Sequence, residues 1–386
     1  MKSEEITKRR QKMIVLDVRL DNFYAFKNFH MNLTYPKKIV DSSIKNEHLP
    51  GRPNFRYKKV NIFLGANATG KTTFGKILMK IFNFIEKKNF EIITNVIHDT
   101  RKKASFVLDL ASENNEFYRI RCEINPCTEE KYTISDIKVQ ILTEKIGVRD
   151  SYNSCANRVA NVSFAPAENY IEELEKVGEL AWLFDYPDTD GFKVDLPNKD
   201  VEFCIILENV LKSLDPSINN VRILKPVENS YVLTIHNQPL VLQSNVEIKT
   251  DMLSSGTKSG IAIARMLYSL KRGLNSFYYC DEKFSYIQSD VEKAILSVMI
   301  DFVGPYDQLF FTTHNTDILD MNLPKHSFTF LRKDVSHEDC PITCIEASSL
   351  LKRNTDSLRN AVENDLFSTV PAVEKIYSLS DLVSKE

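Results

Sequence analysis

The segment Gly65–Thr72 has residue types and a spacing that suit phosphate binding. It reads Gly-Ala-Asn-Ala-Thr-Gly-Lys-Thr and fits G-x-x-x-x-G-K-[ST] at every fixed position. The two glycines let the backbone curl so that successive N–H groups point at phosphate oxygens. Lys71 supplies a positive charge to the same oxygens, and the Thr72 hydroxyl suits Mg²⁺. The residues predicted to contact phosphate are therefore Gly65, Ala66, Asn67, Ala68, Thr69, Gly70, Lys71, Thr72 and Thr73.

The flanking sequence predicts a strand before this loop and a helix after it. Val60–Leu64 is a short apolar run, and the apolar spacing from about Lys71 to Phe84 is helical. The N-terminus of a helix favours an anion. A glycine turn with an exposed lysine is the alternative, and the strand–loop–helix order favours the phosphate loop.

Two carboxylates end a second apolar run. Ser276-Phe-Tyr-Tyr-Cys predicts a buried strand that ends at Asp281 and Glu282. An aspartate at the end of such a strand can hold the Mg²⁺ shell, and Glu282 is then placed to polarise an attacking water. A strand that runs into a solvated turn is the simpler alternative.

A third segment, Leu253–Gly260, precedes a predicted helix at Ile261–Leu270. Ser254 and Ser255 can donate hydroxyl hydrogen bonds, and Gly256 exposes N–H groups at the helix start, which makes a second anion cradle. The alternative is an ordinary capped helix. However, the chain has only 11 glycines, and those at 65, 70, 256 and 260 lie in these two segments. That concentration favours a functional role.

The run Gln308-Leu-Phe-Phe-Thr-Thr is a predicted strand that ends at His314. A lone histidine at a strand end is usually structural. Here it follows the strand of Asp281 as the next strand of a parallel sheet would, so that we expect His314 at the same edge.

In this order, the segments resemble the ABC ATPases of the RecF, SMC and OLD group. Gly65–Thr72 resembles the Walker A motif, Leu253–Gly256 the ABC signature, and Asp281-Glu282 the Walker B motif. Further likenesses are Ile287–Asp290 to the D-loop, His314 to the switch histidine, and Asn22–Asn28 to the N-terminal strand motif. The segments around Ser254 and His314 are most similar to small bacterial AAA-type ATPases found with phage-defence systems.

The resemblance implies an ATPase that uses ATP and Mg²⁺. Thr72 and Asp281 would hold the metal, Glu282 would be the catalytic base, and His314 would contact the γ-phosphate. Ser254, Ser255 and Gly256 would face the ATP of a second copy, which gives a homodimer; a larger oligomer is left open. The implied partner is a separate, nuclease-type effector.

The expected fold is α/β: a P-loop NTPase of the ABC-head type with a mainly parallel sheet, an antiparallel meander and a helical lobe. We expect one head over residues 1–386: a P-loop half with the meander (1–167), an inserted helical and strand region (168–246), and a half with the signature, Walker B and histidine (247–386). The strands expected in the P-loop half are two within Met13–Asn32, followed by Ala104–Leu110, Glu116–Ile124, Lys131–Leu142 and Asn161–Ala165.

One motif of the group has no clear match. The Q-loop glutamine, which usually lines the γ-phosphate, is not placed. Gln140 is a poor candidate, and Ala165-Pro-Ala-Glu168 lies near the expected position without a glutamine.

Composition narrows the remaining choices. The 386 residues carry a net charge of −2, which argues against a broadly basic nucleic-acid binder, although a local contact with DNA is left open. No apolar run is long enough to span a membrane, and no secretory signal is apparent, so that we expect a cytoplasmic protein without a membrane partner. The seven cysteines, including Cys340 and Cys344, lack zinc-site spacing with other ligands. Asp188 and Asp190 could suggest a Toprim nuclease, but their Pro- and Gly-bearing surroundings favour a solvated turn.

Four function classes follow: an ATPase that controls a defence effector, a RecF- or SMC-like DNA-repair ATPase, the nucleotide subunit of a transporter, and a self-contained toxin. The absence of a heptad series counts against SMC. The N-terminal strand motif and the unplaced Q-loop count against the transporter, and no further catalytic set supports the toxin. The first class is favoured, with DNA repair as the alternative.

Overall fold

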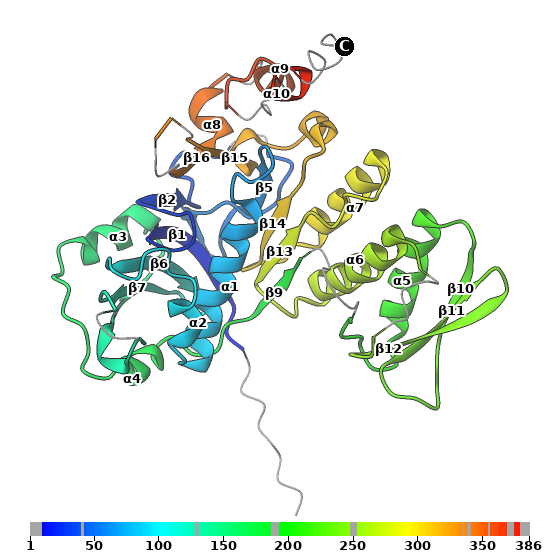
Figure 1. The fold of residues 1–386 in the computed structure, drawn as a ribbon, viewed down its shortest axis with the longest axis horizontal. Coiled ribbons are helices and arrows are strands. Elements are labelled where there is room, and N and C mark those ends of the chain that lie inside the picture. Colours follow the sequence, from blue (N-terminus) through cyan, green and yellow to red (C-terminus); the bar gives the residue numbers. More distant parts are fainter. Residues whose placement is uncertain are drawn as a thin grey trace, which may run out of the picture.

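The computed structural model describes residues 10–39, 42–127, 131–186, 193–247, 253–334, 336–337, 341–353, 356–368 and 374–378. Their helices and strands form a mixed α/β fold built around two large sheets and a lobe to one side (Figure 1). Asp188, Asp190 and Cys340, which entered the sequence analysis, lie outside the described residues.

The central sheet has six strands and is mainly parallel. Its order is β16 (Ile342–Glu346), β15 (Phe328–Lys333), β5 (Val60–Leu64), β14 (Gln308–Thr312), β13 (Phe277–Asp281) and β9 (Trp182–Asp185). Only the pairing of β15 with β16 is antiparallel. Every residue of β5, β13 and β14 is buried, as expected for parallel strands covered on both faces.

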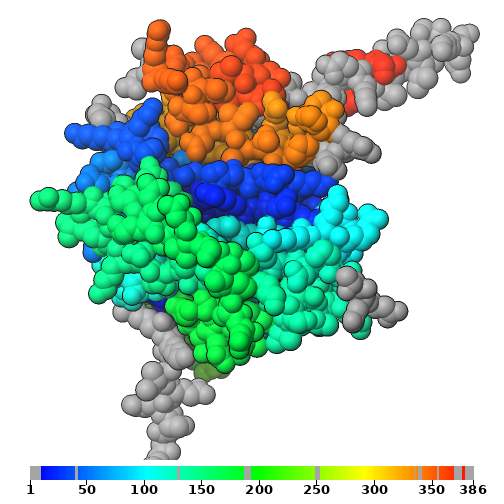
Figure 2. Space-filling model, turned by 90° about the vertical axis from the view of Figure 1, so that its left-hand side faces the viewer, coloured from blue at the N-terminus to red at the C-terminus, as the bar shows by residue number. Residues whose placement is uncertain are grey.

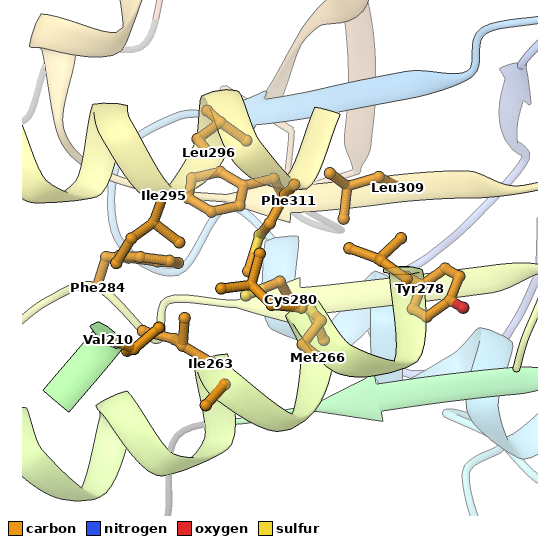
Figure 3. Packing of buried hydrophobic residues seen from close by; sticks show 14 of the residues in the cluster. Val210, Ile263, Met266, Tyr278, Cys280, Phe284, Ile295, Leu296, Leu309 and Phe311 are labelled. Carbon is orange, nitrogen blue, oxygen red and sulfur yellow. The ribbon is translucent and has the colours of Figure 1, made fainter. Parts of the chain in front are cut away.

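Helices cover the two faces of this sheet. On one face, α1 (Lys71–Lys87) shares a hydrophobic cluster with Phe63, Tyr279 and Phe310. On the other face, α6 (Ser255–Arg272) and α7 (Ser289–Phe302) pack against the alternate residues of the same strands. Figure 3 shows Cys280 and Phe311 among the side chains of these two helices. The predicted mainly parallel sheet is confirmed.

A five-stranded antiparallel sheet carries the N-terminal strands and the meander. Its order is β2 (Phe29–Asn32), β1 (Met13–Asp21), β6 (Ala104–Ser112), β7 (Glu116–Ile124) and β8 (Ile137–Lys145). The meander is therefore confirmed. The short helices α2 (Glu91–Thr94), α3 (Tyr152–Ala160) and α4 (Tyr170–Leu174) lie around it (Figure 1).

Two strand predictions in this region need correction. The strand expected from Lys131 begins only at Ile137, because Thr133 and Asp136 cap the 3-10 turn η1 (Ile134–Asp136). The strand expected at Asn161–Ala165 is wrong: the segment follows α3 and has no strand partner. The carbonyls of Val162 and Ser163 instead accept hydrogen bonds from the side chains of Arg121 and Gln140.

A lobe at one side of the central sheet packs against α6, the helix that begins with the predicted signature. The lobe consists of α5 (Val201–Leu214) and the antiparallel strands β10 (Ile218–Ile223), β11 (Ser230–Ile235) and β12 (Gln238–Gln243). The other elements of 168–246 lie elsewhere, since α4 contacts β8 and β9 is an edge strand of the central sheet. The three-part division of the head stays a prediction.

The remaining described elements are short. The hairpin β3 (His48–Leu49) and β4 (Arg52–Arg56), the turns η3 (Thr316–Asp320) and η4 (Lys325–Ser327), and the helices α8 (Ala347–Leu350), α9 (Leu358–Glu363) and α10 (Glu374–Tyr377) complete the described elements. In Figure 2 the N-terminal strands form a band between residues of the meander region and this C-terminal part. Within the described ranges, no helix is long and apolar enough to cross a membrane.

Candidate functional site

The loop Gly65–Thr72 joins the carboxyl end of β5 to α1 in a conformation that needs its glycines. Gly65 and Gly70 have φ values of 150° and 102°. A Cβ on Gly65 would lie 2.7 Å from the Leu331 carbonyl oxygen, and one on Gly70 would lie 2.7 Å from Ile342 Cδ1. Gly70 is the N-cap of α1 and offers no side-chain cap, so that the first N–H groups of the helix are available to an anion.

Lys71 places its ammonium group over this loop. Lys71 Nζ donates to the carbonyl oxygens of Gly65, at 2.9 Å, and Ala66, at 3.2 Å. It also lies 3.7 Å from Glu282 Oε1. Burial lowers the pKa of Lys71, and the charges of Glu282 and Asp281 oppose that shift. A buried cation held among carbonyl oxygens is suited to attract phosphate oxygens.

The predicted metal ligands Thr72 and Asp281 are in direct contact. Thr72 Oγ1 donates to Asp281 Oδ2 at 2.7 Å, and Thr312 Oγ1 donates to the other carboxylate oxygen at 2.7 Å. Burial raises the pKa of Asp281, and the bonds from Thr312 and Thr72 oppose that shift. A divalent cation beside this buried carboxylate would favour its charged form.

These ligands suit Mg²⁺. Among the described residues, no group of three or more His, Cys, Asp and Glu side chains could hold a metal. Mg²⁺ is commonly held by one or two protein oxygens and completes its shell with water and phosphate oxygens. The hydroxyl of Thr72 and the carboxylate of Asp281 are donors of this kind. The Tyr186 hydroxyl is buried near this carboxylate and has no hydrogen-bond partner. Burial raises the pKa of Tyr186, and the charge of Asp281 raises it further.

Glu282 and His314 form a pair at the same edge of the sheet. His314 Nε2 lies 2.8 Å from Glu282 Oε1. This hydrogen bond is the main reason that the pKa of Glu282 is lowered, and the charge of Lys71 acts in the same direction. Glu282 has a φ of 46°, a strained value for a residue with a side chain, and strain of this kind gathers at functional sites. A carboxylate kept charged beside a phosphate loop can accept a proton from water.

The contact between α1 and β13 fixes these groups relative to one another. Tyr279, on β13, donates its hydroxyl to the Lys71 carbonyl oxygen at 2.6 Å. A Cβ on Gly75 would lie 2.4 Å from the ring of Tyr279. The helix therefore approaches the strand closely at this point, one turn beyond Thr72.

The segment Ser254–Gly256 begins α6 on the lobe. Ser254 is the N-cap, and its Oγ accepts from the Thr257 backbone N–H at 3.1 Å. The helix is therefore capped, as expected for an ordinary capped helix. Ser254 and Ser255 are nevertheless exposed. Gly256 lies near the Tyr286 carbonyl, with an ordinary 3.5 Å separation for an added Cβ.

A cleft of ≈ 1260 Å³ opens beside the phosphate loop. Its walls come from Gly65–Thr69, His314, the end of β15 with the residues that follow it, and the C-terminal segment around Val362 and Glu363. Ser254, Ser255 and Gly256 do not line the cleft, and neither do Lys71, Thr72, Asp281 and Glu282. The hydrogen bonds and ion pairs described above join the Walker-type residues and the histidine within one chain, and none of those contacts includes a signature-type residue.

Sequence reasoning missed several residues of the site. Tyr279 lies inside β13 and Thr312 is the last residue of β14, and neither was singled out in its apolar run. Lys283 is buried and pairs with Asp185 at 2.8 Å, which ties the end of β9 to the residue after Glu282. Gln140, on edge strand β8, donates a hydrogen bond to the Ser163 carbonyl. The residues that line the cleft include no glutamine that could correspond to the Q-loop residue.

Comparison with solved structures finds similar chains at low sequence identity. No family model matches the chain, and no curated protein matches it in sequence. The structure is similar to an SMC head bound to the C-winged helix domain of ScpA, with a TM-score of 0.49, 12% identity, and coverage of 90% of this chain and 99% of that one. It is also similar to the SMC head domain from Thermotoga maritima, with a TM-score of 0.41, 10% identity, and coverage of 86% and 98%. A third similar structure is the recombination mediator protein RecF, with a TM-score of 0.41, 8% identity, and coverage of 87% of this chain and 100% of that one.

Proposed function

We propose that this chain is an ABC-type ATPase that binds ATP with Mg²⁺ and hydrolyses it to ADP and phosphate. The observation that carries the proposal is the meeting of Lys71, Thr72, Asp281, Glu282 and His314 at one edge of the central sheet. The order and wording of the motifs, which resemble the RecF, SMC and OLD group, support the same conclusion.

Each residue has a role that follows from its contacts. Gly65–Lys71 bind the phosphates through backbone N–H groups and the Lys71 ammonium. Thr72 and Asp281 would hold Mg²⁺, which would supply charge neutralisation at the phosphate oxygens. Glu282 accepts a proton from the attacking water as the bond between oxygen and the γ-phosphorus forms, and ADP leaves as its bond to that phosphorus breaks. His314 keeps the Glu282 carboxylate charged and oriented through the 2.8 Å hydrogen bond.

The proposed site is completed by a second copy. Ser254 and Ser255 are exposed at the start of α6, and the nearby Tyr286 is 73% exposed. Asp290, in the predicted D-loop, is 93% exposed. These residues lie on the surface and outside the cleft of their own chain. The N-terminus of α6 can therefore donate hydrogen bonds to the γ-phosphate of an ATP held by the partner.

The proposed cellular role is control of a separate, nuclease-type effector in bacterial phage defence. Its support is the likeness of the segments around Ser254 and His314 to small bacterial ATPases of such systems. A RecF- or SMC-like role in DNA repair has equal support. Purification of tagged Glu282→Gln protein with ATP from the native host separates the two, since an effector protein favours the first and DNA with repair proteins favours the second.

Hydrolysis by purified protein tests the enzymatic proposal. Wild type should release phosphate from ATP in the presence of Mg²⁺, whereas Glu282→Gln should bind ATP without turnover because the amide cannot accept the proton. Glu228→Gln, which makes the same change at an exposed loop position of the lobe, should keep wild-type turnover. Wild-type turnover in Glu282→Gln would show that another group is the base.

A further inference from the structure

A buried carboxylate lies beneath the loop that carries His314. Glu292 is in the first turn of α7 and only 2% exposed. Its Oε1 accepts from Thr313 Oγ1 at 2.7 Å, and its Oε2 accepts from Asn315 Nδ2 at 2.6 Å. One side chain thus binds the residue before His314 and the residue after it.

The same turn of α7 makes a second set of contacts with this loop. Ser289 Oγ accepts from Asn315 Nδ2 at 2.9 Å and donates to Asp317 Oδ2 at 2.7 Å. Ser289 and Glu292 are three residues apart, so that both face the loop from one side of the helix. The position of the His314 backbone therefore depends on the start of α7.

If this position served packing alone, an apolar side chain would fill it without the free-energy cost of burying a carboxylate. Burial raises the pKa of Glu292, and the hydrogen bonds from Asn315 and Thr313 oppose that shift. Neighbours on α7 such as Leu296 and Met299 fill the core with apolar side chains. Two directed hydrogen bonds, unlike apolar contacts, fix the orientation of what they hold.

We propose that Glu292 is the positioning residue for His314. It holds Thr313 and Asn315 so that the imidazole meets Glu282 at hydrogen-bond distance, and it makes this geometry depend on α7, which begins within the predicted D-loop. The inference rests on the proposed function, because its effect is on ATP turnover.

A double-mutant cycle with His314 tests this inference. Glu292→Ala should lower kcat by at least about ten-fold, the size of effect that general-base geometry controls, with little change in KM. In a His314→Ala background, the same change should lower kcat by less than about two-fold, because residues that act as one unit are not additive. A residue with a merely structural role would lower kcat by the same factor in both backgrounds.

Further variants guard against simple misfolding. Thr313→Val keeps the shape of the side chain but removes the bond to Glu292, together with the bond that Thr313 Oγ1 accepts from the Asn315 backbone N–H, and should show the same dependence on His314. Glu292→Gln can still accept from Asn315 and donate to Thr313, and should recover most of the lost kcat. Ser297→Ala, on the exposed face of α7, should behave as wild type. Thermal unfolding establishes which variants are folded before their turnover is compared.

The outcomes separate the two proposals. The role of Glu292 is supported if wild type hydrolyses ATP, Glu282→Gln does not, and the effects of Glu292→Ala and His314→Ala on kcat are not additive. Equal losses of kcat in both backgrounds, for Thr313→Val as well as Glu292→Ala, overturn that role and leave the ATPase proposal intact. A wild type that does not hydrolyse ATP overturns both.

Discussion

Thr72 Oγ1 donates a hydrogen bond of 2.7 Å to Asp281 Oδ2, although 209 residues separate the two in the chain. Thr72 is in the first turn of α1 and Asp281 ends β13, and the strand β14 lies between β13 and β5. The contact is possible because α1 crosses the sheet and packs on Tyr279 of β13. It brings together the two side chains that would hold Mg²⁺.

Removal of the Lys71 charge should abolish ATP binding. The ammonium lies over the loop, and charge-assisted hydrogen bonds contribute about 1.5–3 kcal/mol each, so that loss of two such bonds weakens binding by about a hundred-fold or more. Calorimetric titration of Lys71→Ala with ATP and Mg²⁺ measures this. Lys76→Ala removes an equal charge from the exposed side of α1 and should bind as wild type. Equal affinity in both variants would exclude Lys71 from the phosphate site.

The acidic limb of the pH–rate profile should depend on His314. Its hydrogen bond lowers the pKa of Glu282, and hydrolysis requires the charged carboxylate. Loss of the bond in His314→Ala raises that pKa toward its ordinary range, so that the decline of kcat on acidification should begin at a higher pH than in wild type. His314→Gln can still donate a hydrogen bond and should show a smaller displacement. An unchanged acidic limb in His314→Ala would mean that another group titrates there.

A methyl group at Gly75 should disturb both stability and the metal site. The added Cβ would lie 2.4 Å from the Tyr279 ring, and overpacking of this kind costs about 1–3 kcal/mol. Relief requires α1 to move from β13, which separates Thr72 from Asp281. Denaturant unfolding of Gly75→Ala should therefore show a lower free energy of unfolding, and ATP should bind more weakly. At Gly256 an added Cβ meets only ordinary contacts, so that Gly256→Ala should unfold as wild type does.

A bulky residue at the start of α6 should separate binding from hydrolysis. Ser255 is exposed and lies outside the cleft of its own chain, so that Ser255→Arg should leave ATP binding by the monomer unchanged. It should block turnover, because the γ-phosphate of the partner would no longer fit against this helix. Ser213→Arg places the same side chain on the exposed face of α5 in the same lobe and should keep turnover. Normal turnover in Ser255→Arg would remove this segment from the active site.

The residues that meet at the edge of the central sheet have local sequence signals, whereas the order of the strands in that sheet has none. The turn chemistry of Gly65 and Gly70 and the apolar runs before Asp281 and His314 are local signals, and the carboxyl ends of parallel strands meet at one edge. Strand order is set by pairing between distant segments, so that no local pattern places β14 between β5 and β13. The contribution of Thr312 follows only from that order.

Local alternation was misleading where tertiary contacts decide. Asn161–Ala165 alternates like a strand, yet most of it is exposed. Side chains from β7 and β8 donate hydrogen bonds to two of its backbone carbonyls. The role of Glu292 had no sequence signal either, because its partners Thr313 and Asn315 come from another element.

That ATP joins two copies of this chain is tested most directly by sedimentation of the Glu282→Gln protein with ATP, with ADP and without nucleotide. With ATP and Mg²⁺ the protein should sediment as a dimer, because the γ-phosphate bridges Lys71 of one copy and the start of α6 of the other. With ADP or without nucleotide it should sediment as a monomer, since those bonds are missing. Identical association in all three conditions would contradict the composite site.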